Sequence, residues 1–183
     1  MNIYLKAFLG LLVVAFFSVS LTSKADDLDL ENTLYLDLIY GRVVIKMFPD
    51  VAPNHVSKIK KLTRDGYYDG SIFHRVIEGF MAQVGAPKGE ISGGTGELLD
   101  AEFSELSHYK GMVSMARPGD INAADSQFFI LTAYVPGLDG EYTIWGEVVS
   151  GMRYVDKIKL GEGPDFNSPD IIIKMQIAAD TIK

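Results

Sequence analysis

The sequence contains no cysteine, a single tryptophan and only three histidines in 183 residues. Without cysteine, the chain can form neither a disulfide framework nor a zinc site built from thiolates. The histidines, His55, His74 and His108, are scattered, and no HxH or HExxH spacing pairs them. The sequence therefore predicts no metal site.

Basic residues are also scarce, because 17 Lys and Arg stand against 24 Asp and Glu and give a net charge of −7. Non-specific binding to nucleic acid depends on clustered basic side chains that neutralise phosphates. An acidic chain lacks this source of affinity. We therefore expect no nucleic-acid partner.

Charge is almost absent from the first 23 residues, where Lys6 is the only charged side chain. It precedes the apolar run 7–19, and the small-x-small triplet SKA follows at 23–25. This order is typical of a secretory signal peptide, so we predict a signal at 1–25, a mature domain at 26–183 and a periplasmic or secreted location. An uncleaved anchor is the alternative. The apolar run is shorter than the roughly 20 residues of a spanning helix, so we expect no stable membrane insertion after cleavage.

Glycine and proline are nearly missing from the first thirty residues but frequent beyond them, which indicates a turn-rich globular domain. Alternation of apolar and polar residues predicts a β-hairpin at 33–40 and 42–48. Pro53 suits a first helical turn, and the apolar spacing after it predicts a helix at 53–65. Its basic residues, including Lys58, are expected to face solvent.

Short apolar segments separated by turns continue through the rest of the chain. Further strands are expected at 72–76, 80–84, 112–116, 128–131, 143–149 and 171–179, and a second short helix at 153–160. Parallel βαβ units would need a helix after nearly every strand. Eight strands with two helices therefore favour a closed barrel or a sandwich.

Motifs for nucleophilic or phosphate chemistry are missing as well. The chain has no GxSxG sequence, and the glycine-rich residues 93–96 lack the lysine of a phosphate-binding loop. A turn is the expected role of 93–96. Ser126 and His74 could be drawn into a catalytic triad only as any chain of this length allows, so we expect no hydrolase.

The segment FHRVIEGFMAQVG, residues 73–85, places Arg75 among apolar residues. A buried and unpaired guanidinium would cost several kcal/mol or more, so this arginine needs a partner or a task. The segment resembles the FHR-V-I-x-GFM-x-Q-G-G signature of cyclophilin-type peptidyl-prolyl isomerases, with Val84 in place of a glycine. GMVSMARPGDINAADSQFFI at 111–130 and LDGEYTIWGEVVSGM at 138–152 are similar to two further motifs of that family, in the same order.

The resemblance implies a mainly β fold, a closed eight-stranded antiparallel β-barrel capped by two α-helices. It implies catalysis of rotation about X-Pro peptide bonds in proline-containing unfolded or extended polypeptides, with no cofactor. By their match to the family's motifs, Arg75 is the expected catalytic residue, and the expected substrate-binding residues are His74, Phe80, Met81, Gln83, Ala116, Arg117, Gln127, Phe129, Leu138 and Tyr142. Gln83 matches the residue that steadies the guanidinium in the family.

The chemistry of the reaction agrees with an arginine. The prolyl nitrogen gains a lone pair in the twisted transition state, so a donor aimed at it binds that state better than the planar ground state. Arginine stays protonated and presents several N–H groups in a rigid fork. Structural roles remain open: the apolar residues could be barrel core, and Arg75 could belong to a structural ion pair.

Three further positions depart from the family pattern. Gly137 stands where many eukaryotic members have a tryptophan that bonds to cyclosporin, and Tyr142 replaces a frequent histidine. We therefore expect weak cyclosporin binding with isomerisation retained. Arg117 replaces a frequent asparagine and is expected to favour acidic residues beside the proline.

Two functions stay open at this point. The first is an isomerase that assists the folding of exported proteins. The second is a non-catalytic chaperone or scaffold module that binds proline-containing peptides. Arg75 favours the isomerase, because binding alone needs no donor at the prolyl nitrogen.

Overall fold

The predicted hairpin opens the fold. In a computed structural model, which describes residues 29–88 and 90–182, β1 (Thr33–Leu38) pairs antiparallel with β2 (Gly41–Met47). The tight connection needs Gly41, which has a φ of +138° and lies against the ring of Tyr154. The hairpin prediction is confirmed; the predicted signal peptide lies outside the described residues.

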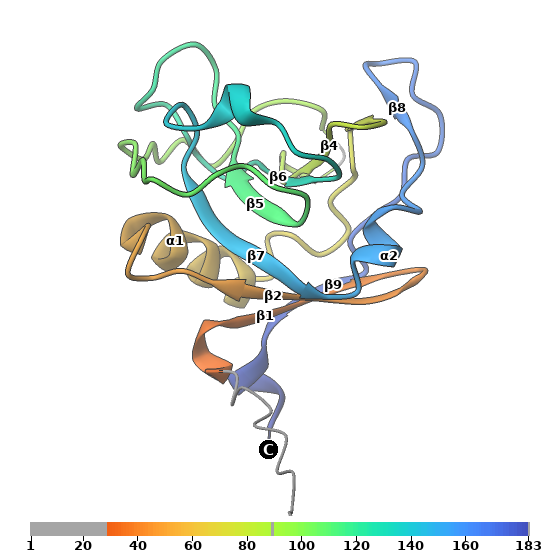
Figure 1. Cartoon of the computed structure of the whole chain (residues 1–183). Helices are drawn as coiled ribbons and strands as arrows, with labels where there is room; N and C mark the ends of the chain where they lie inside the picture. Colours follow the sequence, from red (N-terminus) through yellow and green to blue (C-terminus); the bar gives the residue numbers. More distant parts are fainter. Residues whose placement is uncertain (1–28, 89, 183) are drawn as a thin grey trace, which may run out of the picture.

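The other elements follow in an order close to the predicted one (Figure 1). They are α1 (Pro53–Arg64), β3 (Arg75–Ile77), β4 (Met81–Val84), β5 (Met112–Met115), β6 (Phe128–Leu131), β7 (Ile144–Ser150), α2 (Met152–Val155), β8 (Gly161–Glu162) and β9 (Lys174–Ile177), with short 3-10 turns η1 (Leu30–Asn32), η2 (Pro136–Leu138) and η3 (Ala178–Thr181). Across the part of the chain that the structure describes, no helix combines the length and the apolar character needed to cross a bilayer.

The nine strands form one sheet in the order β8-β3-β4-β6-β5-β7-β2-β1-β9, and every paired neighbour is antiparallel. The sheet curls into a half-barrel, with α1 on one side and α2 on the other, beyond the end of β7 (Figure 1). The mainly β class with two helices is therefore confirmed. The predicted count of eight strands is wrong, because the second helix ends at Val155 and the chain adds the short strand β8.

The sheet is also not the clearly closed barrel that was expected. Closure would require β9 to pair along the free edge of β3, but β8 occupies that edge, with Glu162 opposite Arg75. The segments that precede β3 and β9 are joined by one isolated bridge, Ile72 with Ile171, and by a few backbone hydrogen bonds beside it. The sheet thus stays open where the chain places β8 beside β3.

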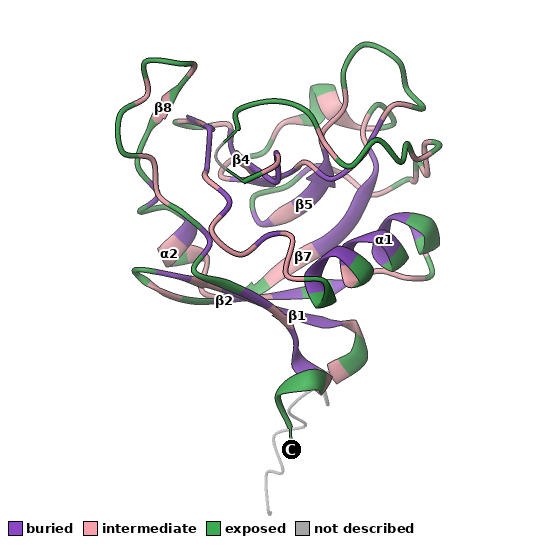
Figure 2. Ribbon diagram, turned by 180° about the vertical axis from the view of Figure 1, so that it is seen from behind, coloured by how far each residue is buried: buried purple, intermediate pink, exposed green. Residues whose placement is uncertain are grey.

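Helix α1 begins at Pro53 and is capped from a distance. Glu102 accepts hydrogen bonds from the backbone N–H groups of Asn54 and His55, at 3.0 Å each. These donors have no partner inside the helix, and a carboxylate also suits the positive end of the helix dipole. The apolar side of α1 packs against the sheet (Figure 2).

Lys58 of α1 corrects the expectation of a fully solvated basic face. The side chain is buried, and its Nζ donates to Asp125 Oδ1 at 2.7 Å and to the carbonyl oxygen of Glu97. Asp125 also accepts from Thr95 Oγ1 and from the backbone N–H of Gly96. Burial opposes ionisation of Asp125, but these donors outweigh it and lower the carboxyl pKa. The burial of Lys58 is tolerated because Asp125, which lies on a loop distant in the sequence, supplies the opposite charge.

Strand β6 separates the core from the site. Phe128 packs edge-on against Tyr68 and Trp145 in the main core, at centroid distances of 5.5 and 5.4 Å. The next residue, Phe129, points to the opposite face and belongs to a smaller cluster with Met81 and Leu131. The alternation of side chains along one strand thus builds the core on one face and an apolar patch on the other.

Candidate active site

The smaller cluster forms the floor of a pocket of about 270 Å³ on the outer face of the sheet. Strands β3, β4 and β6, the end of β5 and the turn η2 each contribute to it. Nine of the eleven residues that the sequence predicted for the site line this pocket: Arg75, Phe80, Met81, Gln83, Ala116, Arg117, Phe129, Leu138 and Tyr142. Segments far apart in the sequence therefore meet at one apolar hollow.

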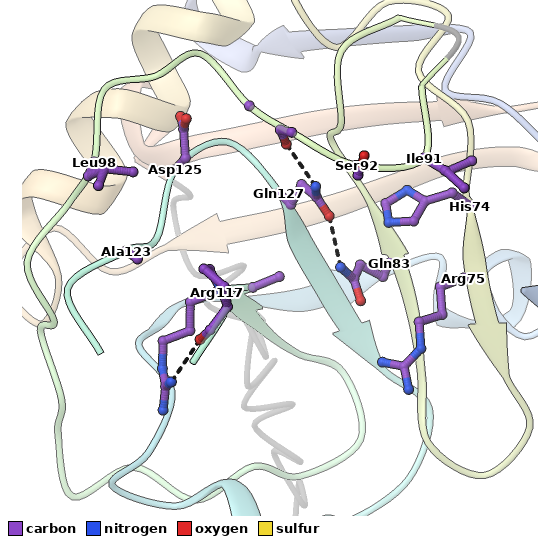
Figure 3. Close-up of a pocket in the computed structure, with 14 residues that line it drawn as sticks. His74, Arg75, Gln83, Ile91, Ser92, Leu98, Arg117, Ala123, Asp125 and Gln127 are labelled. Atoms are coloured by element: carbon purple, nitrogen blue, oxygen red, sulfur yellow. Dashed lines mark hydrogen bonds between the residues drawn. The ribbon is translucent and has the colours of Figure 1, made fainter. Parts of the chain in front are cut away.

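The remaining two predicted residues, His74 and Gln127, line an adjoining cavity of about 510 Å³. The two hollows share Arg75, Gln83, Ala116 and Arg117, so they form one continuous groove. Figure 3 shows the residues that line the larger cavity, among them Ile91, Ser92 and Leu98 from the loop that follows β4. Sequence reasoning did not predict this second hollow, because its wall includes loop residues that match no motif.

Arg75 stands at the junction of the two hollows. It lies on β3 with its side chain 41% exposed, so the guanidinium stays partly in water and the cost of burial is small. Its Cζ lies 5.8 Å from the centre of the Phe80 ring. A permanently charged donor therefore borders the apolar pocket.

The partner of Arg75 differs from the expected one. Gln83 faces Arg75 across the strand pair, yet its Nε2 donates to Gln127 Oε1 at 2.9 Å. Gln127 Nε2 in turn donates to the carbonyl oxygen of Gly93 at 2.8 Å (Figure 3). Arg75 Nε instead donates to Glu162 Oε2 at 3.0 Å. A carboxylate binds a guanidinium more strongly than a neutral amide does, and the sequence contained no signal that β8 would supply one.

His74 is buried at the edge of the groove. Burial lowers the pKa of its imidazole, and the positive charge of Arg75 lowers it further. The ring is therefore neutral at neutral pH. A neutral His74 leaves Arg75 as the permanently charged donor on this side of the pocket.

Arg117 contacts both hollows but does not extend into solvent. Its side chain is only 10% exposed, and its Nη2 donates to the carbonyl oxygen of Glu141 at 2.9 Å. Nη1 donates to the carbonyl oxygens of Pro118 and Gly119, and the guanidinium lies over the Tyr142 ring at 4.7 Å. The positive charge of Arg117 thus contacts carbonyl oxygens and an aromatic ring of the protein itself, which argues against the expected preference for acidic substrates.

Replacement of Arg117 by Gln is therefore expected to act through Tyr142. We expect kcat/KM to fall by about three- to ten-fold, which corresponds to the loss of one cation–π contact and its hydrogen bonds. The assay should compare two proline peptides that differ only in an acidic or a neutral residue beside the proline. Equal losses on both peptides agree with the contacts of Arg117 to Tyr142 and the nearby carbonyl oxygens, whereas a loss confined to the acidic peptide would restore the preference expected from sequence.

Metal-binding residues do not gather in this groove. Within residues 29–88 and 90–182, no three His, Asp or Glu side chains lie close enough to bind one metal ion together. The arrangement offers an apolar pocket, a cationic donor at its edge and sheet backbone beside it. These are the parts needed to hold an extended peptide by one ring-shaped apolar side chain.

Fold and site together define a curled antiparallel sheet with a partly apolar groove on its outer face. Residues 33–177 match the family model for the cyclophilin type peptidyl-prolyl cis-trans isomerase/CLD. The chain belongs to this family, and it is a peptidyl-prolyl cis-trans isomerase.

Relatives and solved structures agree with this assignment. A Brucella suis protein described as a probable peptidyl-prolyl cis-trans isomerase is 47% identical over 179 residues, covering 90% of this chain and 91% of its own. The peptidyl-prolyl cis-trans isomerase of Helicobacter pylori is 40% identical over 126 residues, covering 67% and 77%. A cyclophilin from Hirschia baltica superimposes with a TM-score of 0.76 at 28% identity, covering 85% of this chain and 77% of that one. A Cryptosporidium parvum cyclophilin, determined in the presence of the dipeptide Ala-Pro, gives 0.72 at 30% identity and covers 79% and 98%.

Proposed function

We propose that this isomerase assists the folding of exported polypeptides by rotating their X-Pro bonds, with Arg75 as the catalytic donor. The observation that carries the proposal is the placement of the Arg75 guanidinium at the edge of a pocket lined by Phe80, Met81, Phe129 and Leu138. The pocket suits a proline ring in size and polarity. The guanidinium can donate a hydrogen bond to the nitrogen of that ring.

The mechanism needs no bond to be made or broken. Resonance gives the peptide C–N bond a rotational barrier of about 18–20 kcal/mol, and uncatalysed X-Pro rotation takes tens of seconds or longer. Rotation pyramidalises the prolyl nitrogen and localises its lone pair. An Arg75 N–H that donates to this lone pair strengthens as rotation proceeds, so it lowers the barrier rather than only improving binding.

The peptide backbone on either side of the proline would pair with the end of β5. The N–H of Ala116 already donates to the carbonyl oxygen of Gln127 within the sheet, at 2.8 Å. Among the described residues outside the strands, the carbonyl oxygen of Ala116 and the N–H of Arg117 form no backbone hydrogen bond, so they can face a substrate strand. The Cryptosporidium parvum relative was determined in the presence of Ala-Pro, a dipeptide of the kind that such a groove would hold.

A protease-coupled assay on a proline peptide tests the catalytic part of the proposal. The domain should exceed the uncatalysed rate at catalytic concentrations. The alternative, a chaperone or scaffold module that only binds proline segments, predicts saturable binding with no acceleration. Arg75 favours catalysis, because a binding module gains nothing from a donor directed at the prolyl nitrogen.

The exported location rests on residues 1–25 and needs its own test. We expect the mature protein to begin at Asp26 and to occur in the periplasm or the medium. Mass spectrometry of the protein from fractionated cells gives its N-terminus and its compartment. An intact N-terminus in a membrane fraction would support the anchor instead, and a cytoplasmic chain would contradict export.

Cyclosporin is expected to bind weakly, because Gly137 offers no indole donor. A Cβ added at Gly137 would meet open space, so a larger side chain fits there. We expect Gly137→Trp to raise cyclosporin affinity by about 10- to 100-fold, the gain from one buried aromatic contact and a hydrogen bond. Isothermal titration of both proteins measures it. Low-nanomolar affinity of the unaltered protein would contradict this role of Gly137.

A further inference from the structure

The partner of Arg75 comes from a segment outside the family motifs. Strand β8 is only two residues long, and its pairing with β3 places Glu162 directly opposite Arg75. The carboxylate accepts from Arg75 Nε at 3.0 Å. Arg75 and Glu162 are thus joined by the pairing of their strands and by their side chains, which fixes the position of one relative to the other.

This contact fixes the guanidinium at one end and leaves the other end available. Among the described residues, Glu162 is the only hydrogen-bond partner of the Arg75 side chain, and it contacts Nε. The guanidinium is planar, so an anchored Nε sets the direction of Nη1 and Nη2. Arg75 borders both hollows of the groove, which puts these terminal donors on the substrate side.

The segment that carries Glu162 is itself ordered by close packing. Gly161 has a φ of +155°, and a Cβ there would lie 2.4 Å from Cδ2 of Phe166, so only glycine lets the ring pack this closely. The backbone N–H of Lys159 donates to Asp170 at 2.8 Å. Glu162 is therefore presented by a folded loop.

Gln83 does not compete with Glu162 as the hydrogen-bond partner of Arg75. Its amide donates to Gln127, which in turn is bonded to Gly93, so both glutamines are engaged with the cavity wall (Figure 3). The contact with the guanidinium that the family resemblance implied for Gln83 is thus made in this chain by a carboxylate from β8.

We propose that Glu162 is a positioning residue for catalysis: its carboxylate holds Arg75 Nε so that the terminal N–H groups point at the prolyl nitrogen. The inference rests on the proposed catalytic role of Arg75. Both side chains are well exposed, at 41% and 59%, so the pair contributes little to folding stability. Its effect lies in the fraction of time that the guanidinium spends in the reactive orientation.

The test compares Glu162→Ala and Glu162→Gln with a control, Asp165→Ala. Asp165 lies on the same loop, is exposed and carries the same charge, but among the described residues it forms no hydrogen bond or ion pair with Arg75. We expect Glu162→Ala to lower kcat about two- to five-fold with KM unchanged, the range set by an exposed ion pair. Glu162→Gln, which keeps an acceptor oxygen, should fall between it and the wild type, and Asp165→Ala should match the wild type.

A spectroscopic measurement separates positioning from a general effect of charge. In NMR spectra of the ¹⁵N-labelled protein, the Arg75 Nε–H should exchange slowly with water, and Glu162→Ala should abolish this protection. An unchanged kcat, an equal loss in Asp165→Ala, or an unaltered Nε–H signal would overturn the inference.

Arg75→Ala separates the catalytic role from the positioning role. If that variant keeps full activity, the proposed role of Arg75 fails; if it loses activity while Glu162→Ala does not, only the positioning role fails.

Discussion

Replacement of Arg75 by Ala is expected to lower kcat/KM on a proline peptide by about 100- to 1000-fold, the effect of removing one preorganised donor from a developing charge. The loss should fall mainly on kcat, because the apolar pocket that holds the proline ring remains intact. A protease-coupled assay measures it. Stability should change little, since the Arg75 side chain is well exposed and its one ion pair lies at the surface.

Arg153→Ala serves as the matched control for Arg75→Ala. Arg153 is an exposed arginine on α2, and it lines neither hollow of the groove. Its removal takes away the same charge and should leave kcat/KM unchanged. Activity of Arg75→Ala within about two-fold of the wild type would remove Arg75 from the mechanism.

Replacement of Phe129 by Ala is expected to remove the floor of the proline pocket. Phe129 is 5% exposed and packs edge-on against Tyr142 at 5.7 Å. Without the ring, the proline has less apolar surface to pack against, so kcat/KM should fall by about 10- to 100-fold. The cavity left behind should destabilise the fold by about 3–5 kcal/mol. The assay and urea unfolding of the same preparation measure the two effects.

The adjacent Phe128 provides a control of identical chemistry. Its ring is fully buried in the main core against Tyr68 and Trp145, on the opposite face of β6. Phe128→Ala should therefore cost at least as much stability as Phe129→Ala, while the folded fraction keeps most of its activity. If both variants lose activity in proportion to stability, Phe129 is only a core residue.

The fold was largely predictable, because its elements follow from local patterns. Alternation defines the hairpin at β1 and β2, and Pro53 with its apolar spacing defines α1. The open edge was not predictable. It depends on β8, whose two residues are too few for any periodicity, and on their pairing with β3 some 87 positions earlier in the chain. The burial of Lys58 escaped prediction for the same reason, since its partner Asp125 is distant in sequence.

The candidate site was likewise predictable only in part. The lining residues were found because they stand in long motifs, and the structure brings those motifs together at one groove. What each side chain contacts could not be found in this way. Gln83 bonds to Gln127, Arg117 folds back onto Tyr142, and Arg75 pairs with Glu162. Hydrogen-bond partners depend on distances of a few tenths of an ångström, which motifs do not encode.

The role proposed for Arg75 is to accelerate rotation of the X-Pro bond rather than merely to help the groove bind it. Exchange NMR on an Ala-Pro peptide at equilibrium measures binding and rotation in the same sample, without a protease. We expect the wild-type protein to accelerate cis–trans exchange, and Arg75→Ala to bind the peptide still but leave its exchange near the uncatalysed rate. Equal exchange rates with the two proteins, or binding by the wild type without any acceleration, would contradict this role.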